Sequence, residues 1–315
     1  MSSYAPGLQD LGGGCYAYLQ PDGGWGLSNA GLVVSEGESL LVDTLFDLPR
    51  TREMLAAMAR AEPRAAARIG TVVNTHHNGD HCFGNELLEG AEIIASRAAA
   101  AAMRAETPEL LAGYLRAAPQ LGALGEYLVH CFGRFDFTGI RQVLPTLTFE
   151  GRMDRAVGSR VVEVFEVGPA HTAGDVIVHV PSSKTVFTGD ILFIEGHPIM
   201  WAGPVSHWID ACERILALDV ETVVPGHGPV TDKRGVRAMM GYLVYVRDEA
   251  TKRYRAGMPA FEAAQDIALT DYASWGDAER IVVNVTTIYK ELAGDASASD
   301  PAALFAQMAR LRAAR

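Results

Sequence analysis

The heptapeptide Thr75-His76-His77-Asn78-Gly79-Asp80-His81 constrains this chain more than any other stretch. It contains only polar residues and glycine, and it follows the mostly apolar run of residues 69–73. An apolar run that breaks into His and Asp is typical of a buried strand that presents side chains from the loop at its end. The heptapeptide therefore predicts a polar site beyond the end of a strand.

Three later segments repeat this pattern. His171, Asp190 and His227 each follow an apolar run and each lie close to glycine. Glycine permits the irregular backbone that such loops need. Imidazole nitrogen and carboxylate oxygen are zinc ligands, and a catalytic zinc site keeps one position open for water. A single His in an apolar context is usually a core residue, but four such strand ends in one chain predict one metal centre.

Composition and charge narrow the class of protein. The chain has 315 residues, of which 49% are apolar, so it can bury a large core as one large domain or two small ones. Its net charge of -11 repels phosphate backbones and disfavours nucleic acid as a partner.

Compartment and membrane association are also constrained. The chain has no apolar run of about 18 residues, so no membrane span is expected. Residues 1–6 lack the pattern of a secretory signal. The four cysteines are far apart with no CxxC spacing, which favours a reduced, cytoplasmic setting.

Strands and helices alternate along the first half of the chain, which predicts α/β layering. Strands are expected at 14–20, 30–34, 39–44, 69–73, 92–95, 147–149, 161–167, 176–180, 185–188 and 222–224. Helices are expected at 48–61, from 84, from 97, and at 108–117, 121–131, 208–218 and 236–256, with a mainly helical tail.

No linker or repeat divides the chain. We expect a single domain over residues 1–315, with a helical insertion at about 101–145 and a helical extension at about 236–315. The insertion, which ends in an aromatic cluster at 132–137, is expected near the mouth of the site, although its helices could merely flank the sheet. The extension could cover the core or form a homodimer interface.

The order His76-x-x-x-Asp80-His81, then His171, Asp190 and His227, resembles the metallo-β-lactamase superfamily of hydrolases over roughly residues 14–230. The resemblance implies an αββα sandwich with two metal ions at one edge. It also implies that His76 and His171 hold the first metal, that Asp80, His81 and His227 hold the second, and that Asp190 bridges the two.

Position 78 departs from the usual His-x-His-x-Asp-His pattern of that family. Asn78 offers only a neutral carbonyl oxygen, which is a poorer zinc ligand than imidazole. We therefore expect two zinc ions with a weaker first site, in which Asn78 is a weak or water-mediated ligand. His77 is out of step with the family register. The sequence Asn-Gly-Asp-His followed by Cys-Phe-Gly-Asn resembles a subset of the superfamily.

Other polar and aromatic residues are candidates for supporting roles. Asp175, in His171-Thr-Ala-Gly-Asp175, is expected to hydrogen-bond a ligand or a loop amide, or else to cap a turn. The residues expected to line a substrate pocket are Trp25, Phe135, His197, Trp201 and His207. Trp25 is either a rim residue or a hydrophobic flap over the substrate.

These features predict a hydrolase of an ester, thioester or lactone. A pair of divalent ions can ionise a shared water at neutral pH, and Asp80 and Asp190 are positioned to orient it and move its proton. The aromatic residues favour an apolar or aromatic small molecule. The chain also resembles the thioesterase and cyclase members of the family that act on aromatic polyketides.

Three alternatives stay open. A β-lactam hydrolase would use the same metals, although the missing secretory signal argues against export. A sulfur-oxidising enzyme with a single iron would rely on the first site, which Asn78 weakens. A non-catalytic binding protein would need this chemistry to be disabled, yet Asp80 and Asp190 are both present.

Overall fold

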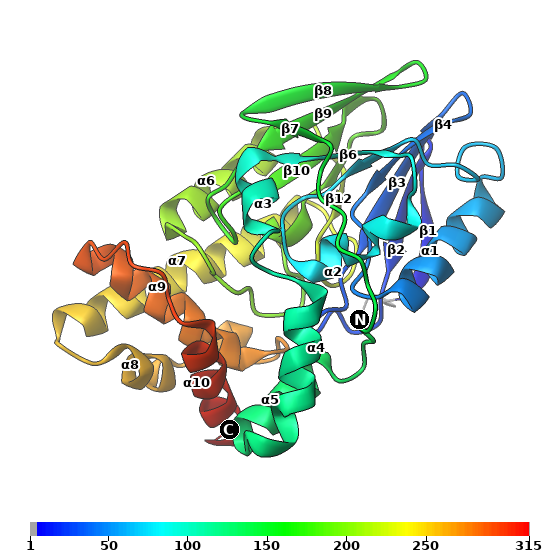
Figure 1. Cartoon of the computed structure of the whole chain (residues 1–315). Helices are drawn as coiled ribbons and strands as arrows, with labels where there is room; N and C mark the ends of the chain where they lie inside the picture. The colour runs from blue at the N-terminus through cyan, green and yellow to red at the C-terminus, as the bar shows by residue number, and fades with distance from the viewer. Residues whose placement is uncertain (1–4, 315) are drawn as a thin grey trace.

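Two β-sheets form the centre of the computed structural model, which describes residues 5–314 (Figure 1). The first sheet has the order β1-β2-β3-β4-β5-β6-β7 and the second the order β12-β11-β10-β9-β8. The strands of the first sheet are β1 (Gly7–Gly12), β2 (Cys15–Leu19), β3 (Ala30–Ser35), β4 (Glu38–Val42), β5 (Thr71–Val73), β6 (Glu92–Ser96) and β7 (Leu147–Phe149). The strands of the second are β8 (Arg152–Val157), β9 (Arg160–Glu166), β10 (Val176–Val180), β11 (Thr185–Phe187) and β12 (Thr222–Val224).

Each sheet changes from antiparallel to parallel pairing toward the site. Strands β1 to β4 pair antiparallel, whereas β4, β5, β6 and β7 pair parallel. In the second sheet β8 to β11 are antiparallel and β11 pairs parallel with β12. The segments that follow β5, β11 and β12 carry the polar motifs.

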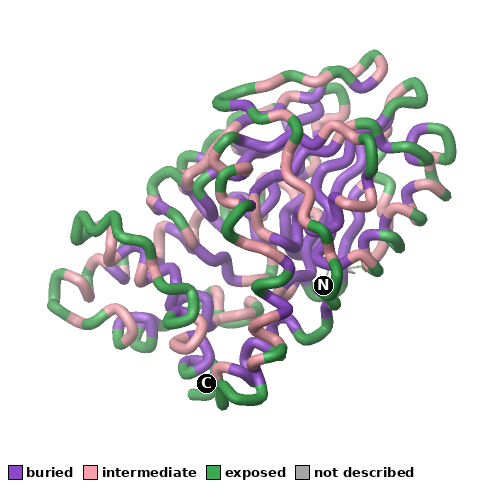
Figure 2. Tube along the Cα trace, viewed as in Figure 1, coloured by how far each residue is buried: buried purple, intermediate pink, exposed green. Residues whose placement is uncertain are grey.

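Alternate side chains of the two sheets pack face to face. Leu40, Val73, Val178 and Val224, from four different strands, belong to one fully or almost fully buried cluster. Figure 2 shows this buried band along the strands. Gly31 of β3 lies against the ring of Phe187 of β11, and a Cβ at position 31 would come within 2.3 Å of that ring. This glycine therefore lets a large ring fill the space between the sheets.

Helices cover both outer faces, so the predicted α/β sandwich is confirmed. Helix α1 (Leu48–Ala61) buries Met54 and Met58 against the first sheet, and its N-terminus is capped by Asp47, whose side chain accepts from the amide of Arg50. Helices α6 (Val205–Ala217) and α7 (Lys233–Arg255) cover the second sheet. The α1 bounds agree with the range predicted from helical spacing.

Helix α3 (Arg97–Ala102) lies beside β6 and β7 and leads to α4 (Pro108–Ala117) and α5 (Ala123–Phe132). These last two helices gather at one end of the molecule with the helices of the tail, which are α8 (Ala260–Asp266), α9 (Ile281–Ala293) and α10 (Pro301–Ala314) (Figure 1). Helix α10 packs against α5, so segments far apart in sequence meet there (Figure 1). None of the helices within residues 5–314 is both long and apolar enough to cross a membrane.

Several element predictions differ from the structure. Strands β1 and β8 were not predicted, because both sequences carry polar or charged residues and little apolar alternation. The helical segment expected from residue 84 instead starts within the heptapeptide, as the single-turn α2 (Gly79–Cys82) followed by a 3₁₀ helix (Phe83–Leu87). Helices α6 and α7 each begin three residues earlier than predicted.

Candidate metal centre

The loops after four strands bring six His and Asp side chains to one edge of the sandwich. The segment after β5 supplies His76, Asp80 and His81, and the loop between β9 and β10 supplies His171. Asp190 follows β11 and His227 follows β12. The six residues form two clusters, one of His76, His171 and Asp190 and one of Asp80, His81 and His227, each with its ligand atoms within 4.8 Å of one another.

Asp190 lies between the two clusters. Its Oδ2 is 3.4 Å from His171 Nε2 and 3.5 Å from His227 Nε2, and its Oδ1 is 3.1 Å from His81 Nε2. In the second cluster Asp80 Oδ2 is 3.3 Å from His227 Nε2. Ligand atoms that each lie about 2 Å from a shared zinc ion are spaced by roughly 3–3.5 Å.

Several buried polar atoms of the two clusters have no good hydrogen-bond partner within the protein. His76 Nε2, His81 Nε2 and Asp190 Oδ1 are buried and make no well-aligned hydrogen bond, although the last two lie 3.1 Å apart. A buried polar atom without a partner costs about 1–3 kcal/mol, so three that face one another point to a common partner. Imidazole and carboxylate together suit a divalent cation such as zinc. The residues present therefore fit the metal pair that the sequence predicts.

Each imidazole is held through its Nδ1 atom, which leaves Nε2 to face the cluster. His81 Nδ1 donates to Asp43 Oδ2 at 2.9 Å, and His76 Nδ1 donates to Thr75 Oγ1 at 3.0 Å. His171 Nδ1 donates to the Ile199 carbonyl at 2.6 Å, and His227 Nδ1 to the Gly23 carbonyl at 3.1 Å. Partners of this kind fix the tautomer and orientation of a metal-binding histidine.

Asp43 is a supporting residue that the sequence prediction missed. Its carboxylate accepts from the Thr75 amide and hydroxyl, both at 2.7 Å, as well as from His81. Its φ of 63° lies in the left-handed region, directly after β4. The signal was present, because Asp43 follows the apolar run 40–42 just as the predicted ligands follow theirs.

Asp175 holds the loop that carries His171. Its carboxylate oxygens accept from the Thr172 amide at 2.9 and 3.1 Å and from the Thr172 hydroxyl at 2.6 Å. Burial raises the pKa of Asp175 to about 7. The side chain thus binds a loop amide, one of the arrangements expected from the sequence.

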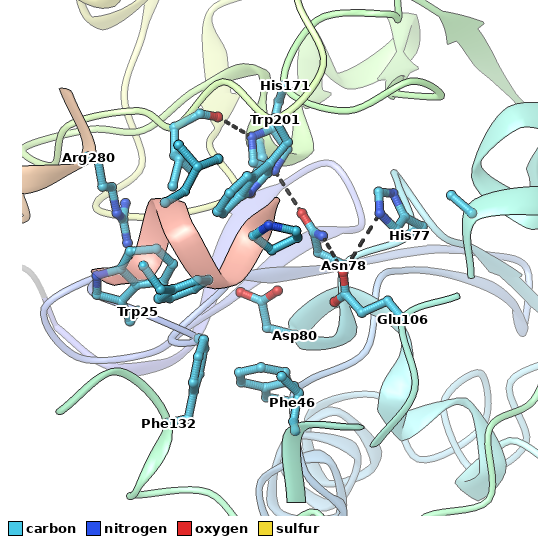
Figure 3. A pocket seen from close by; sticks show the side chains of 18 of the residues that line it. Trp25, Phe46, His77, Asn78, Asp80, Glu106, Phe132, His171, Trp201 and Arg280 are labelled. Carbon is cyan, nitrogen blue, oxygen red and sulfur yellow. Dashed lines mark hydrogen bonds and ion pairs between the residues drawn. The ribbon is translucent and has the colours of Figure 1, made fainter. Parts of the chain in front are cut away.

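Asn78 lies at the first cluster, whereas His77 does not. Asn78 Oδ1 is 2.9 Å from His171 Nε2, and Asn78 Nδ2 donates to Glu106 Oε2 at 3.0 Å. His77 turns toward Glu106, with His77 Nε2 3.7 Å from Oε2 (Figure 3). Of these two neighbouring side chains, Asn78 therefore faces the first cluster and His77 faces away from it.

Without metal, the two carboxylates place protons on the second cluster. Burial lowers the pKa of His227, but Asp190 and Asp80 outweigh it and raise the pKa to about 9. The pKa of His81 is raised well above its usual value in the same way, against burial, by Asp190, Asp80 and Asp43. Burial lowers the pKa of His76 and of His171. A metal ion in the second cluster would displace protons.

A cavity of about 500 Å³ lies above the two clusters. Its polar end is lined by Asn78, Asp80, His171, Asp190 and His227. Figure 3 shows the first three of these side chains. The cavity walls are mostly apolar and come from the loops, from the 102–132 segment and from the start of α10. The main wall residues are Trp25, Phe46, Leu110, Leu111, Tyr114, Phe132, Phe193, Ile199, Trp201, Leu304 and Phe305.

Two of the five predicted pocket residues line this cavity. Trp201 and Trp25 are both among its wall residues. The Trp25 ring contacts Phe305, with centroids 5.5 Å apart, and Phe132, at 6.0 Å. Trp25 is therefore packed among aromatic rings as part of a wall.

The other three lie elsewhere, which corrects the prediction. Phe135 is buried behind Phe46, with ring centroids 4.8 Å apart. His197 is fully buried and packs against Tyr242 and Trp275. His207 is exposed on α6. Proximity to Asp190 in sequence suggested these two histidines, but the packing of the helices after residue 233 decides where the chain around them points.

Comparison with known proteins identifies related chains. A family model described as the metallo-beta-lactamase superfamily matches residues 23–227. Hydroxyacylglutathione hydrolases of Brucella ovis and Brucella abortus are each 27% identical over 199 residues. These matches cover 62% of this chain and 60% of each relative, so the chain spans about three-fifths of the relatives' length.

Solved structures show the same fold at low identity. A stereoselective inverting sec-alkylsulfatase from Pseudomonas sp. matches with a TM-score of 0.69 and 16% identity, over 91% of this chain and 50% of that chain. A metallo-beta-lactamase from Pontibacter korlensis matches with a TM-score of 0.56 and 19% identity, over 75% of this chain and 98% of that chain.

Proposed function

Because this chain belongs to the metallo-β-lactamase superfamily, we propose that it is a hydrolase that uses two divalent metal ions, taken to be zinc, to cleave an ester, thioester or lactone. One observation carries the proposal. Two His/Asp clusters with unpaired buried atoms lie at the polar end of an otherwise apolar cavity. That arrangement brings a reactive centre and the body of a small molecule into one space.

The candidate ligands divide into two sets, one for each ion. His76, His171, Asn78 and Asp190 would hold the first, and Asp80, His81, His227 and Asp190 the second. When bound, such ions lower the pKa of water and stabilise negative charge that develops on a carbonyl oxygen.

Asp80 and Asp190 supply the proton chemistry from the protein side. Both carboxylates line the cavity and face the histidines. Burial raises the pKa of Asp190, but His227 and His81 outweigh it and hold the pKa well below its usual range. An ionised carboxylate at this point orients an attacking water, accepts its proton and passes it to the leaving group.

The walls favour a neutral, apolar substrate. Arg280 is the one Lys or Arg among the cavity-lining residues within the described part of the chain. Its Nη2 is 2.9 Å from Asp277 Oδ2, its Nη1 donates to the His197 carbonyl, and its guanidinium lies 4.4 Å from the Trp25 ring centroid. Since both Nη atoms of this cation are already engaged and only its buried Nε lacks a partner, an anionic body such as the glutathione of a hydroxyacylglutathione finds little compensation here. An aromatic polyketide thioester is one candidate substrate of the favoured kind.

A hydrolysis panel with metal counted in the same sample tests the proposal. The panel contains neutral aryl and alkyl thioesters, lactones and esters, together with a hydroxyacylglutathione, a β-lactam and a secondary alkyl sulfate. We expect about two zinc ions per chain and a kcat/KM at least about 10-fold higher for a neutral apolar substrate than for the charged ones. A tenfold ratio corresponds to about 1.4 kcal/mol of transition-state stabilisation.

Chelation should abolish turnover, and zinc should restore it. Asp80→Asn is the matched variant, since it keeps the shape and removes both the proton acceptor and one charged ligand of the second ion. Full activity of folded, metal-free protein would end the proposal, and one iron with oxygen-dependent turnover would replace it with the sulfur-oxidising alternative.

A further inference from the structure

The asparagine at position 78 presents an orientation problem that a histidine does not. A side-chain amide has an oxygen at one end and an NH₂ group at the other, and a half-turn about its last torsion exchanges them. Only the oxygen can bind a cation. The first cluster is therefore complete only if something fixes which end of Asn78 faces His171.

The tautomer of His171 makes the observed orientation unfavourable in the absence of metal. His171 Nδ1 donates to the Ile199 carbonyl. With its one proton on Nδ1, a neutral ring presents a lone pair on Nε2 to Asn78 Oδ1, 2.9 Å away. Two acceptors at this distance need a cation beside them or a proton between them. A flipped amide would instead donate NH₂ to Nε2 and close the site.

Glu106 opposes that flip. Its Oε2 accepts from Asn78 Nδ2 at 3.0 Å, and its Oε1 accepts from the Gly79 amide at 2.9 Å. A carboxylate only accepts, so a flipped Asn78 would set its oxygen against the Glu106 oxygen. Asn78 makes no capping bond to α2 with its own side chain, and Glu106 binds the orphan amide of Gly79 in its place.

The loop that carries Glu106 is itself fixed. Glu106 lies between α3 and α4, immediately before Thr107, whose side chain accepts from the Leu110 amide at the start of α4. The Gln142 side chain donates to the carbonyl of Glu106 at 2.8 Å and to that of Met103. The segment predicted as an insertion thus delivers a carboxylate to the back of Asn78 (Figure 3).

We propose that Glu106 is a positioning residue that locks the Asn78 amide with its oxygen toward the first metal ion, so that an Asn-containing site keeps a usable ligand at this position. The inference rests on the proposed metal centre. Glu106 belongs to neither ligand cluster, and both of its carboxylate oxygens are engaged away from the ions. Hydrogen bonding to the NH₂ group also polarises the amide and makes its oxygen a stronger metal ligand.

Zinc and cobalt(II) titrations of Glu106→Gln test the inference directly. Gln can donate to the Asn78 oxygen, so the flipped, closed form becomes available. We expect the weaker metal equivalent to lose about 10- to 100-fold in affinity, as is usual when the outer partner of a ligand is removed. The tighter equivalent should keep the parent value. The cobalt absorption spectrum reports the two sites without any need for turnover.

Two variants separate positioning from general folding. Glu109→Gln, on the exposed face of α4 where its side chain is 76% exposed, is the matched control and should leave both equivalents unchanged. In an Asn78→His background, an imidazole replaces the amide. Glu106→Gln should then change the first-site affinity by less than about threefold, which gives a coupling of at least about threefold in the double-mutant cycle.

Each outcome decides the inference. Parent-like affinity of both sites in Glu106→Gln would overturn it. The same loss in the Asn78→His background would also overturn it, because Glu106 would then act on the turn and not on the amide. A parent protein that binds no metal would overturn the proposed function together with this inference, whereas two metals in both proteins would leave the proposed function intact.

Discussion

Asp43 is linked by hydrogen bonds to a histidine in each of the two clusters of the candidate centre. Its carboxylate orients His81 and also fixes Thr75, whose hydroxyl in turn accepts from His76. One side chain therefore sets the direction of an imidazole in each of the two clusters. A buried group with three donors has no spare capacity for a neutral substitute.

Asp43→Asn should weaken zinc binding at the second cluster by about 10- to 100-fold while the chain stays folded. The amide would have to turn an NH₂ group toward Thr75 or toward the Nδ1 proton of His81. Competition with a chromogenic chelator measures the affinity. Asp219→Asn, at a side chain that is 84% exposed, is the control. Unchanged zinc affinity in Asp43→Asn would show that the position of His81 does not depend on this carboxylate.

At the residue scale, the sequence could predict only those site residues that a local pattern of apolar and polar residues marks. The side chains proposed as metal ligands could be found because each follows an apolar strand, and the structure brings them together. Glu106 has no such signal, since only the return of its loop to Asn78 gives it a role. His197 and His207 had the right residue type, but side-chain direction depends on tertiary packing that no local pattern contains.

At the scale of elements, helix α10 and the segment from α3 to α5 build the cavity walls that the sheets do not. Phe305 of α10 contacts Trp25, Phe132 and Trp201, with ring centroids 5.5–6.0 Å apart. Leu304 and Pro301 line the same cavity. These residues lie beyond the 23–227 stretch that matches the family model. The shape of the cavity is therefore set partly by residues outside the stretch that matches the family model.

Phe305→Ala should change substrate choice more than turnover. Removal of the half-buried ring takes apolar contact from the wall, so KM for the preferred substrate should rise about 10-fold, with kcat within about threefold. Bulkier acyl groups should gain relative to small ones. Steady-state kinetics across a series of acyl sizes checks this. Phe261→Ala, on α8 outside the cavity lining, should leave the order of preference unchanged, and an unchanged order in Phe305→Ala would contradict the prediction.

Most elements with strong periodicity could be predicted from sequence, and those without it could not. Helix α1 has a cap, a proline at its start and regularly spaced methionines, so its bounds followed directly. Strand β8 alternates exposed and half-buried residues at the edge of its sheet. Its charged residues interrupt the apolar alternation by which a strand is predicted from sequence. The start of α2 inside the heptapeptide was missed because four residues are too few to show a helical period.

At the scale of the whole molecule, a metal ion and protons would compete for the same histidine nitrogens at the edge of the sandwich. In the metal-free protein, His227 and His81 hold protons that an unfolded chain would release near pH 6.5. A histidine with a raised pKa in the folded state stabilises the fold below the unfolded pKa, and this contribution is lost as pH rises through the folded pKa.

Chelator-treated protein should therefore be less stable at pH 9 than at pH 7, by about 1–3 kcal/mol. The pKa of the buried Asp175, which burial raises to about 7, acts in the same direction. Stoichiometric zinc should remove most of this loss, because the ion takes the place of the protons. Urea unfolding at both pH values, with and without zinc, measures it. Equal stability of the metal-free protein at both pH values would mean that these histidines are not protonated in the fold.

The glycine at position 31 has a consequence for the centre that lies beyond its own contact. His76 and His81 are anchored to one sheet, whereas Asp190 and His227 are anchored to the other. The separation that Gly31 and Phe187 set between the sheets is thus also the distance across which the two halves of each ligand cluster face one another. The thickness of the apolar core would therefore decide how closely those ligand atoms could approach a bound cation.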